Sequence, residues 1–202
     1  METKDDLTGL PDDDSVSRAL ANLRTYAEAL GVRVTDDYAI PDHARFVGLF
    51  ENHTITLYPL SAPPFACWFT IAHLYGHMTQ LVNKTPRVDK ANALVLRIGE
   101  TLTHNDVQLI YDHEREAAEI GRTLVAGVEQ RLSPEMDVAY SRFFHADFRY
   151  LINAIETGER GPAVFARFWR REPIPRELIK PDERPLLDMW KVQPSTERII
   201  VI

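Results

Sequence analysis

The segment from Phe65 to Val82, FACWFTIAHLYGHMTQLV, carries apolar side chains on nearly every face of a helix. A helix that is apolar all round is typical of a protein interior, so this pattern predicts a buried central helix. His73 and His77 stand four residues apart in it and therefore lie one turn apart on the same face. This is the spacing at which two imidazoles can reach one metal ion.

The expected burial of these two rings strengthens the case for a metal site. A buried ring nitrogen without a partner costs about 1–3 kcal/mol, so His73 and His77 each need a ligand or a hydrogen bond. A metal ion would satisfy both rings together. The alternative is a pair of core histidines that are bonded to backbone carbonyls, and this helix alone leaves both interpretations open.

A third ligand would have to come from another helix, and the pattern from about 106 to 132 predicts one long helix there. Glu114 stands at the head of its apolar face, where a carboxylate is unfavourable unless it is paired. The same stripe continues with small and aliphatic side chains, which let another helix approach: Ala117, Ala118, Gly121, Leu124, Val125 and Val128. Glu116 stands at the start of a helical row that mixes apolar and polar side chains. The helical position of His113 directs its side chain towards the interior. The alternative for all three is a surface patch of ion pairs around Arg115 and Arg122.

The rest of the chain predicts the elements around these two helices. We expect an amphipathic helix at 15–30, a small antiparallel sheet with a hairpin of RFVGLF (45–50) and TITLY (54–58), a helix-like stretch at 90–102, and helices at about 135–157 and 161–171. The aromatic stripe from Tyr140 to Leu151 is expected in the core. The Pro-rich tail, 173–202, ends in RIIVI, a β-prone run that would add to a sheet edge.

Composition excludes several classes of protein. The chain has 202 residues and a net charge of −7, most of which falls in residues 1–14, an expected flexible acidic leader. The nearly neutral remainder disfavours nucleic-acid binding as the main activity. A single cysteine, Cys67, excludes an intramolecular disulfide and a Cys-rich zinc site. No signal peptide or membrane-spanning run is visible, so we expect a cytoplasmic protein that does not associate with a membrane.

The phrase FTIAHLYGH (69–77), followed by EREAAEIGRTLV (114–125), resembles the ImmA/IrrE family of zinc metallopeptidase-like proteins. The family pattern is H-E-x-x-H on a buried helix with a downstream helix of the type E-x-E-A-N-x-F-A. The resemblance covers about residues 15–131 and implies an α+β fold with a zincin-like core. It also implies Zn²⁺, held by His73, His77 and Glu114, with Glu116 as the fallback ligand. Residues 132–172 would then form a helical C-terminal extension.

This chain departs from the family pattern at the catalytic position. Leu74 stands where the family has the Glu that takes a proton from the metal-bound water. Loss of a general base typically costs about 10²- to 10⁴-fold in rate. Ala118 replaces a common Asn or Asp, which removes a hydrogen bond to a ligating histidine. Of the nearby groups, which are Tyr75, Asp112, His113 and Glu116, His113 is the best candidate for a replacement base.

Two classes of function follow from these observations. The first is a degenerate metallopeptidase-like protein that binds Zn²⁺, or has lost it, and acts as a metal-binding or regulatory interaction module. The resemblance suggests a helix-turn-helix transcriptional repressor as its protein partner. The second is an active zinc endopeptidase with a replacement base that cleaves such a regulatory protein. An Fe²⁺ site is a weaker possibility, because two histidines and one carboxylate also suit that ion.

Overall fold

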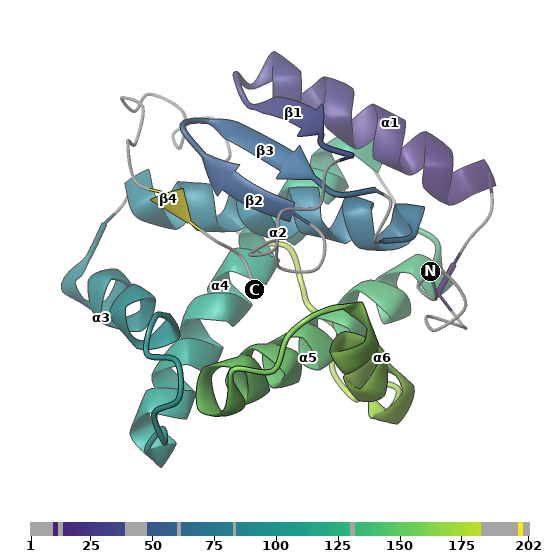
Figure 1. Cartoon of the computed structure of the whole chain (residues 1–202). Helices are drawn as coiled ribbons and strands as arrows, with labels where there is room; N and C mark the ends of the chain where they lie inside the picture. The colour runs from purple at the N-terminus through teal and green to yellow at the C-terminus, as the bar shows by residue number, and fades with distance from the viewer. Residues whose placement is uncertain are drawn as a thin grey trace.

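The computed structural model describes residues 10–11, 14–38, 48–59, 62–82, 84–129, 132–182 and 198–199. These residues form an α+β fold in which helices dominate (Figure 1). The elements are α1 (Asp14–Ala29), β1 (Arg33–Asp36), β2 (Gly48–Glu51), β3 (Thr54–Leu57), α2 (Pro64–Val82), α3 (Pro86–Val95), α4 (His104–Glu129), α5 (Pro134–Thr157), α6 (Pro162–Arg171) and β4 (Arg198–Ile199).

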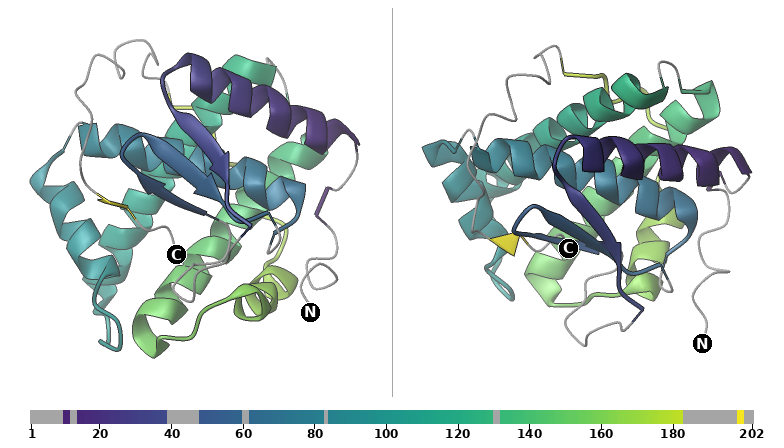
Figure 2. Two further views of the ribbon diagram at one scale, coloured as in Figure 1. Left: turned by 45° about the horizontal axis from the view of Figure 1, so that its top comes forward. Right: turned by 90° about the horizontal axis from the view of Figure 1, so that it is seen from above.

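Helix α2 is the central element, as its sequence predicts. All its residues from Phe65 to Leu81 are buried. It packs against α1 and α4 and against strands β2 and β3. In Figure 1 it runs beneath the sheet, with α3, α5 and α6 below it, and the view from above in Figure 2 shows α1 beside it. The helix is therefore covered by other elements on every side, which explains its apolar composition.

The sheet is mixed, so the prediction of an antiparallel sheet was wrong for its first strand. The strand order is β1-β3-β2-β4, and β1 pairs with β3 in parallel. Alternating side chains specify which face of a strand is buried but not the direction of its neighbour. The chain between Asp36 and Gly48 is long enough to bring β1 alongside β3, on the far side from β2.

The predicted hairpin is confirmed within the described residues. Strands β2 and β3 pair antiparallel, with Gly48 opposite Leu57 and Glu51 opposite Thr54. Asn52 and His53 form the two-residue turn, and both have positive φ values, of 48° and 59°. Turns of this kind match the twist of the flanking strands. The first residues of the expected strand, 45–47, lie outside the described residues.

The C-terminal run adds to this sheet at its edge, as its β-prone sequence predicts. Phe50 of β2 pairs with Ile199, and Glu51 pairs with Arg198, in antiparallel register. Residues 200–202 lie outside the described part of the chain. The tail between 172 and 182 has no helix or strand and crosses two helices, where Ile179 N donates to Ser141 Oγ of α5 at 2.8 Å and Asp182 N donates to Thr123 Oγ1 of α4 at 2.5 Å.

Helix α3 begins and ends earlier than the predicted stretch at 90–102. Thr85 caps its start, because its hydroxyl accepts from Val88 N at 3.3 Å, and Pro86 occupies the first turn. The helix stops at Val95, and Gly99 beyond it has a φ of +83°. The periodicity of the sequence continues through this stretch, but the cap and the left-handed glycine set the bounds.

The described part of the acidic leader is small. Leu10 is buried in the hydrophobic core, so the expectation of a flexible leader fails at this position. Residues 1–9 and 12–13 lie outside the described residues. None of the helices that the structure describes is long and apolar enough to cross a membrane.

Candidate metal centre

Helix α2 places the two histidines in the interior. His73 is 1% exposed and His77 is 4% exposed, and their ring centroids lie 4.7 Å apart. Phe69, one turn earlier, stacks on the ring of His73 with centroids 5.4 Å apart. The predicted helix and the shared face of the two histidines are both confirmed. Packing on this face fixes the ring of His73 between an aromatic neighbour and the second histidine.

Two glycine contacts bring α4 unusually close to α2. A Cβ atom at Gly76 would overlap the backbone of Ala117, and one at Gly121 would overlap the backbone of Ala72. The contacts are reciprocal, because each helix supplies one glycine and one alanine. Gly76 lies between the two histidines in sequence, and Ala117 lies one turn after Glu114. The close approach therefore occurs beside the three candidate ligands.

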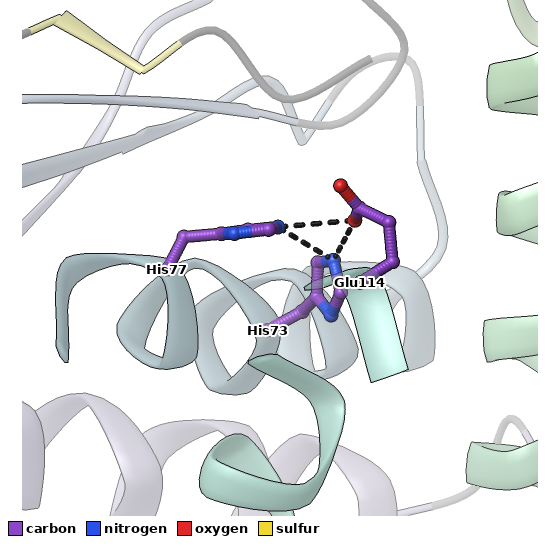
Figure 3. A group of neighbouring side chains, drawn as sticks. All are labelled: His73, His77 and Glu114. Atoms are coloured by element: carbon purple, nitrogen blue, oxygen red, sulfur yellow. Dashed lines mark hydrogen bonds and ion pairs between the residues drawn. The ribbon is translucent and has the colours of Figure 1, made fainter. Parts of the chain in front are cut away.

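Glu114 of α4 reaches both histidines. Its Oε2 lies 3.0 Å from Nε2 of His73 and 3.0 Å from Nε2 of His77, and the two Nε2 atoms lie 3.1 Å apart. Figure 3 shows the three side chains converging from two helices on one point. Among the described residues, this is the one group of three His, Cys, Asp or Glu side chains whose ligand atoms lie together in this way.

The spacing of these three atoms suits a small divalent cation. Tetrahedral coordination with bonds of about 2.0–2.1 Å separates ligand atoms by about 3.3–3.4 Å. The observed separations of 3.0–3.1 Å are slightly shorter, so a modest expansion would admit the ion. Two imidazole nitrogens and one carboxylate oxygen, all from buried residues, form a group that could bind a metal ion.

Gln80, one turn after His77, fixes the proton on that histidine. Its Nε2 donates to the carbonyl oxygen of His113 at 2.8 Å and to Oε2 of Glu116 at 3.1 Å. The amide oxygen of Gln80 is then the atom that faces Nδ1 of His77, at 2.9 Å. An oxygen there can only accept, so Nδ1 of His77 carries the proton. The neutral ring consequently presents the lone pair of Nε2 to the centre, which is the state a metal ligand requires.

His73 has no equivalent support. Its Nδ1 is buried and has no hydrogen-bond partner among the described residues. Ala118 is the position at which the resemblance implies a lost hydrogen bond to a histidine, and its side chain has no polar atom. Ala118 is fully buried, and its carbonyl oxygen accepts from the hydroxyl of Tyr140 at 2.8 Å. A hydrogen bond therefore fixes the proton on Nδ1 of His77, whereas Nδ1 of His73 has no such bond and its ring is held by packing.

The electrostatics of the three groups also favour a cation at the centre. Burial alone would raise the pKa of Glu114, but the charge of His77 and the hydrogen bonds from both histidines hold it well below its usual value. Burial opposes a charge on His77, but the charge of Glu114 and the hydrogen bonds with Glu114 and Gln80 raise its pKa. Burial lowers the pKa of His73. In the metal-free protein a proton on His77 thus takes the place of the cation.

The structure places Glu114 with the two histidines and leaves the fallback ligand outside the group. Glu116 contacts Gln80 rather than either histidine. Glu116 and His113 line a pocket of about 290 Å³ between α2, α3 and α4, together with Gln80, Arg87 and Ile120. None of the three candidate ligands lines this pocket, so it lies beside the centre and not over it.

The candidates for a replacement base lie at different distances from the centre. The ring of His113 is 4% exposed and lies 5.0 Å from that of His77, and burial, followed by the charge of His77, lowers its pKa to about 4. His113 is thus neutral at pH 7 but a weak proton acceptor. Asp112 accepts from Arg87 and Gln108 at the surface. Tyr75 and Leu74 are fully buried.

Gln80 is a residue of the centre that the interpretation of the sequence missed. It is the last strongly polar side chain in the apolar helix and follows His77 by three residues. The sequence therefore contained a sign that Gln80 lies beside His77. Comparison of the chain with family models, with curated proteins and with solved structures found no match. The resemblance to the ImmA/IrrE family and the zincin-like interpretation of the core therefore stay predictions.

Proposed function

We propose that this protein is a metal-binding module in which His73, His77 and Glu114 hold one divalent cation. Zn²⁺ is the first candidate, because two imidazoles and one carboxylate are a common set of protein ligands for it. Fe²⁺ is the second candidate, because the same three groups also bind that ion. When bound, the cation would act as a Lewis acid towards an oxygen ligand.

The observation that carries this proposal is the mutual contact of three buried ligand atoms. Glu114 is 8% exposed, and both histidines are more deeply buried. Without a positive charge at the centre, the lone pairs of Nε2 in His77 and of Oε2 in Glu114 would face each other at 3.0 Å. Either a proton or a metal ion removes this repulsion. A metal ion would satisfy all three atoms at once, whereas one proton satisfies a single pair.

We further propose that the role is regulatory or structural and that rapid peptidase turnover is absent. Leu74 is fully buried and supplies no proton acceptor after the first histidine. The deep burial of the three ligands also leaves little room for a polypeptide substrate. Such a module would act through a protein partner, and the resemblance makes a helix-turn-helix repressor the first partner to test.

Metal analysis of the purified protein tests the proposal. We expect about one equivalent of Zn²⁺ or Fe²⁺ in the wild type and a loss of at least about tenfold in affinity in His73→Ala. His104→Ala is the matched control, because this histidine is exposed at the start of α4. A wild-type protein that retains no metal after incubation with either ion would refute the metal centre.

The alternative, an active endopeptidase with a replacement base, has one observation in its favour, which is the short distance between the rings of His113 and His77. Incubation of the Zn²⁺-loaded protein with casein, with and without a chelator, separates the two functions. We expect no cleavage above the level of His73→Ala. Cleavage by the wild type that the chelator abolishes would establish the peptidase instead.

A further inference from the structure

The pocket between α2, α3 and α4 runs from the surface to the neighbourhood of the metal centre. Its volume of about 290 Å³ lies just below the range of about 300–1,000 Å³ that is typical of pockets for drug-sized ligands, so it suits a smaller molecule. Four of its lining residues are buried, namely Gln80, Val88, His113 and Ile120, whereas Arg87 is exposed. The pocket therefore has an exposed rim at the start of α3 and a buried inner wall.

The inner wall contains a polar atom that lacks a partner. His113 lines the pocket and is 4% exposed, and its Nδ1 is buried with no hydrogen-bond partner among the residues that the structure describes. A buried nitrogen in this state is unfavourable. A polar group of a bound molecule would supply the missing hydrogen bond. This unpartnered nitrogen is the observation that distinguishes the pocket from a simple gap between helices.

The two ions of the lining have opposite charges. Glu116 of α4 supplies a carboxylate and Arg87 of α3 supplies a guanidinium group. Gln80 Nε2 donates to Oε2 of Glu116 at 3.1 Å, and one Nη of Arg87 donates to Asp112 at 2.8 Å. A carboxylate accepts several hydrogen bonds and a guanidinium group donates up to five, so both groups can also bind a ligand. The balance of charge favours a molecule that carries both signs over a simple cation or anion.

Aliphatic side chains form the rest of the inner wall. Val88 of α3 and Ile120 of α4 are both buried and both line the pocket. A hydrocarbon group of a ligand would gain from contact with them. An aliphatic α-amino acid combines the three features that this lining matches, because it has an ammonium group, a carboxylate and a small apolar side chain. These groups would meet Glu116, Arg87 and Ile120 respectively.

Gln80 connects this pocket to the metal centre. It lines the pocket, donates to Glu116, and accepts from Nδ1 of His77 at 2.9 Å through its amide oxygen. An ammonium group bound at Glu116 would compete with Gln80 for the carboxylate and would loosen the amide that orients His77. It would also place a positive charge beside the site of the cation. Both effects oppose metal binding.

We propose that this pocket binds a free aliphatic α-amino acid and that its occupation lowers the affinity of the centre for its metal ion. The pocket itself stands on its lining residues, whereas the coupling rests on the proposed metal-binding function. Linkage requires that the metal ion lower the affinity for the amino acid by the same factor. Metal binding by the module thus responds to the supply of amino acids.

Calorimetric titration of the metal-free full chain with leucine tests the pocket. Isoamylamine and 4-methylpentanoate are the comparison ligands, because each keeps the hydrocarbon group but carries only one of the two charges. We expect leucine to bind at least about tenfold more tightly than either analogue, since each analogue loses a charge-assisted hydrogen bond. Absence of leucine binding, or equal affinity for leucine and one of the analogues, would overturn the assignment of the ligand.

Arg87→Gln tests the location, and Arg97→Gln is its matched control. Both arginines are exposed and each pairs with one acidic residue, but Arg97 does not line the pocket. We expect leucine affinity to fall by at least about tenfold in Arg87→Gln and to keep its wild-type value in Arg97→Gln. Equal leucine affinities in the two variants would place the binding site elsewhere and overturn the proposal.

Zn²⁺ titration with and without saturating leucine tests the coupling. Free leucine itself binds Zn²⁺, so the change in the wild type is measured relative to that in Arg87→Gln in the same solutions. We expect leucine to lower the Zn²⁺ affinity of the wild type by at least about fivefold more than that of the variant. An equal or smaller change would overturn the coupling. Failure of the wild type to bind Zn²⁺ would refute the proposed function and the coupling, while the leucine titration would still decide the pocket.

Discussion

Gly76 of α2 lies against the backbone of Ala117 of α4 so closely that even a methyl group at position 76 would overlap it. Gly76 lies one turn after His73 and directly before His77, and Ala117 lies one turn after Glu114. The contact brings the two helices near enough for one carboxylate oxygen of Glu114 to contact both histidines. The geometry of the centre therefore depends on a residue that has no side chain.

Substitution of Gly76 by Ala should destabilise the protein and weaken metal binding together. The added methyl group must push α4 away from α2, and we expect a loss of about 3 kcal/mol, at the upper end of the cost of overpacking. Chemical denaturation and Zn²⁺ titration measure the two effects. Gly99→Ala is the control, because Gly99 has a φ of +83° but no atom within 4 Å of an added Cβ. Equal Zn²⁺ affinities in the two variants would contradict the positioning role of Gly76.

Glu114 and Glu116 are predicted to differ sharply when each is changed to Gln. Glu114→Gln removes a direct ligand, and we expect Zn²⁺ affinity to fall by more than about a hundredfold, whereas Glu116→Gln should lower it by less than about tenfold. Glu116 accepts a hydrogen bond from Gln80 Nε2 at 3.1 Å and is not part of the group of three clustered ligand residues. Competition with a chromophoric chelator measures both affinities. The reverse ranking would make Glu116 the ligand.

Replacement of Gln80 by Met should free the proton on His77 to move between the ring nitrogens. The variant keeps the size of the side chain but lacks the oxygen that accepts from Nδ1 of His77. At a pH where the ring of His77 is neutral, nitrogen NMR of the metal-free protein would show the Nδ1-protonated form in the wild type and a mixture in Gln80→Met. Zn²⁺ affinity should fall by about 10- to 100-fold. Gln108→Met, at an exposed position of α4, should change neither quantity.

His113 should contribute a loss of stability to the metal-free protein as the pH falls below about 6.5. Burial, followed by the charge of His77, lowers the pKa of His113 from 6.5 to about 4. Between these values the unfolded chain binds a proton at His113 that the folded chain does not bind. His113 alone therefore removes about 2 kcal/mol of stability at pH 5 relative to pH 7. The pKa of His73 is lowered too and adds to the loss, whereas the raised pKa of His77 opposes it.

Urea denaturation at pH 7 and pH 5, in the presence of a chelator, checks this dependence. His113→Gln should show a smaller loss of stability between the two pH values than the wild type. His104→Gln, at an exposed position, should show the wild-type loss. If His113→Gln and the wild type lose the same stability, His113 titrates normally in the folded protein.

Those elements of the fold could be predicted whose burial or turn is visible in the local hydrophobic pattern of one segment. The apolar helix at 65–82 is buried, and the hairpin of β2 and β3 forms, with a two-residue turn at Asn52 and His53. The direction of β1 and the bounds of α3 could not be predicted in the same way. A parallel pairing depends on where the chain returns after the strand, and the start of α3 depends on the cap at Thr85.

The sequence by itself determined the two histidines on one face of a buried helix and the absence of an acid after the first of them. It left the third ligand open between Glu114 and Glu116, because helical periodicity describes one helix at a time. Only the tertiary structure decided that Glu114 meets both histidines and that Gln80 holds His77. The physical reason is the close contact of Gly76 with Ala117, which fixes the separation and rotation of two helices that are distant in sequence.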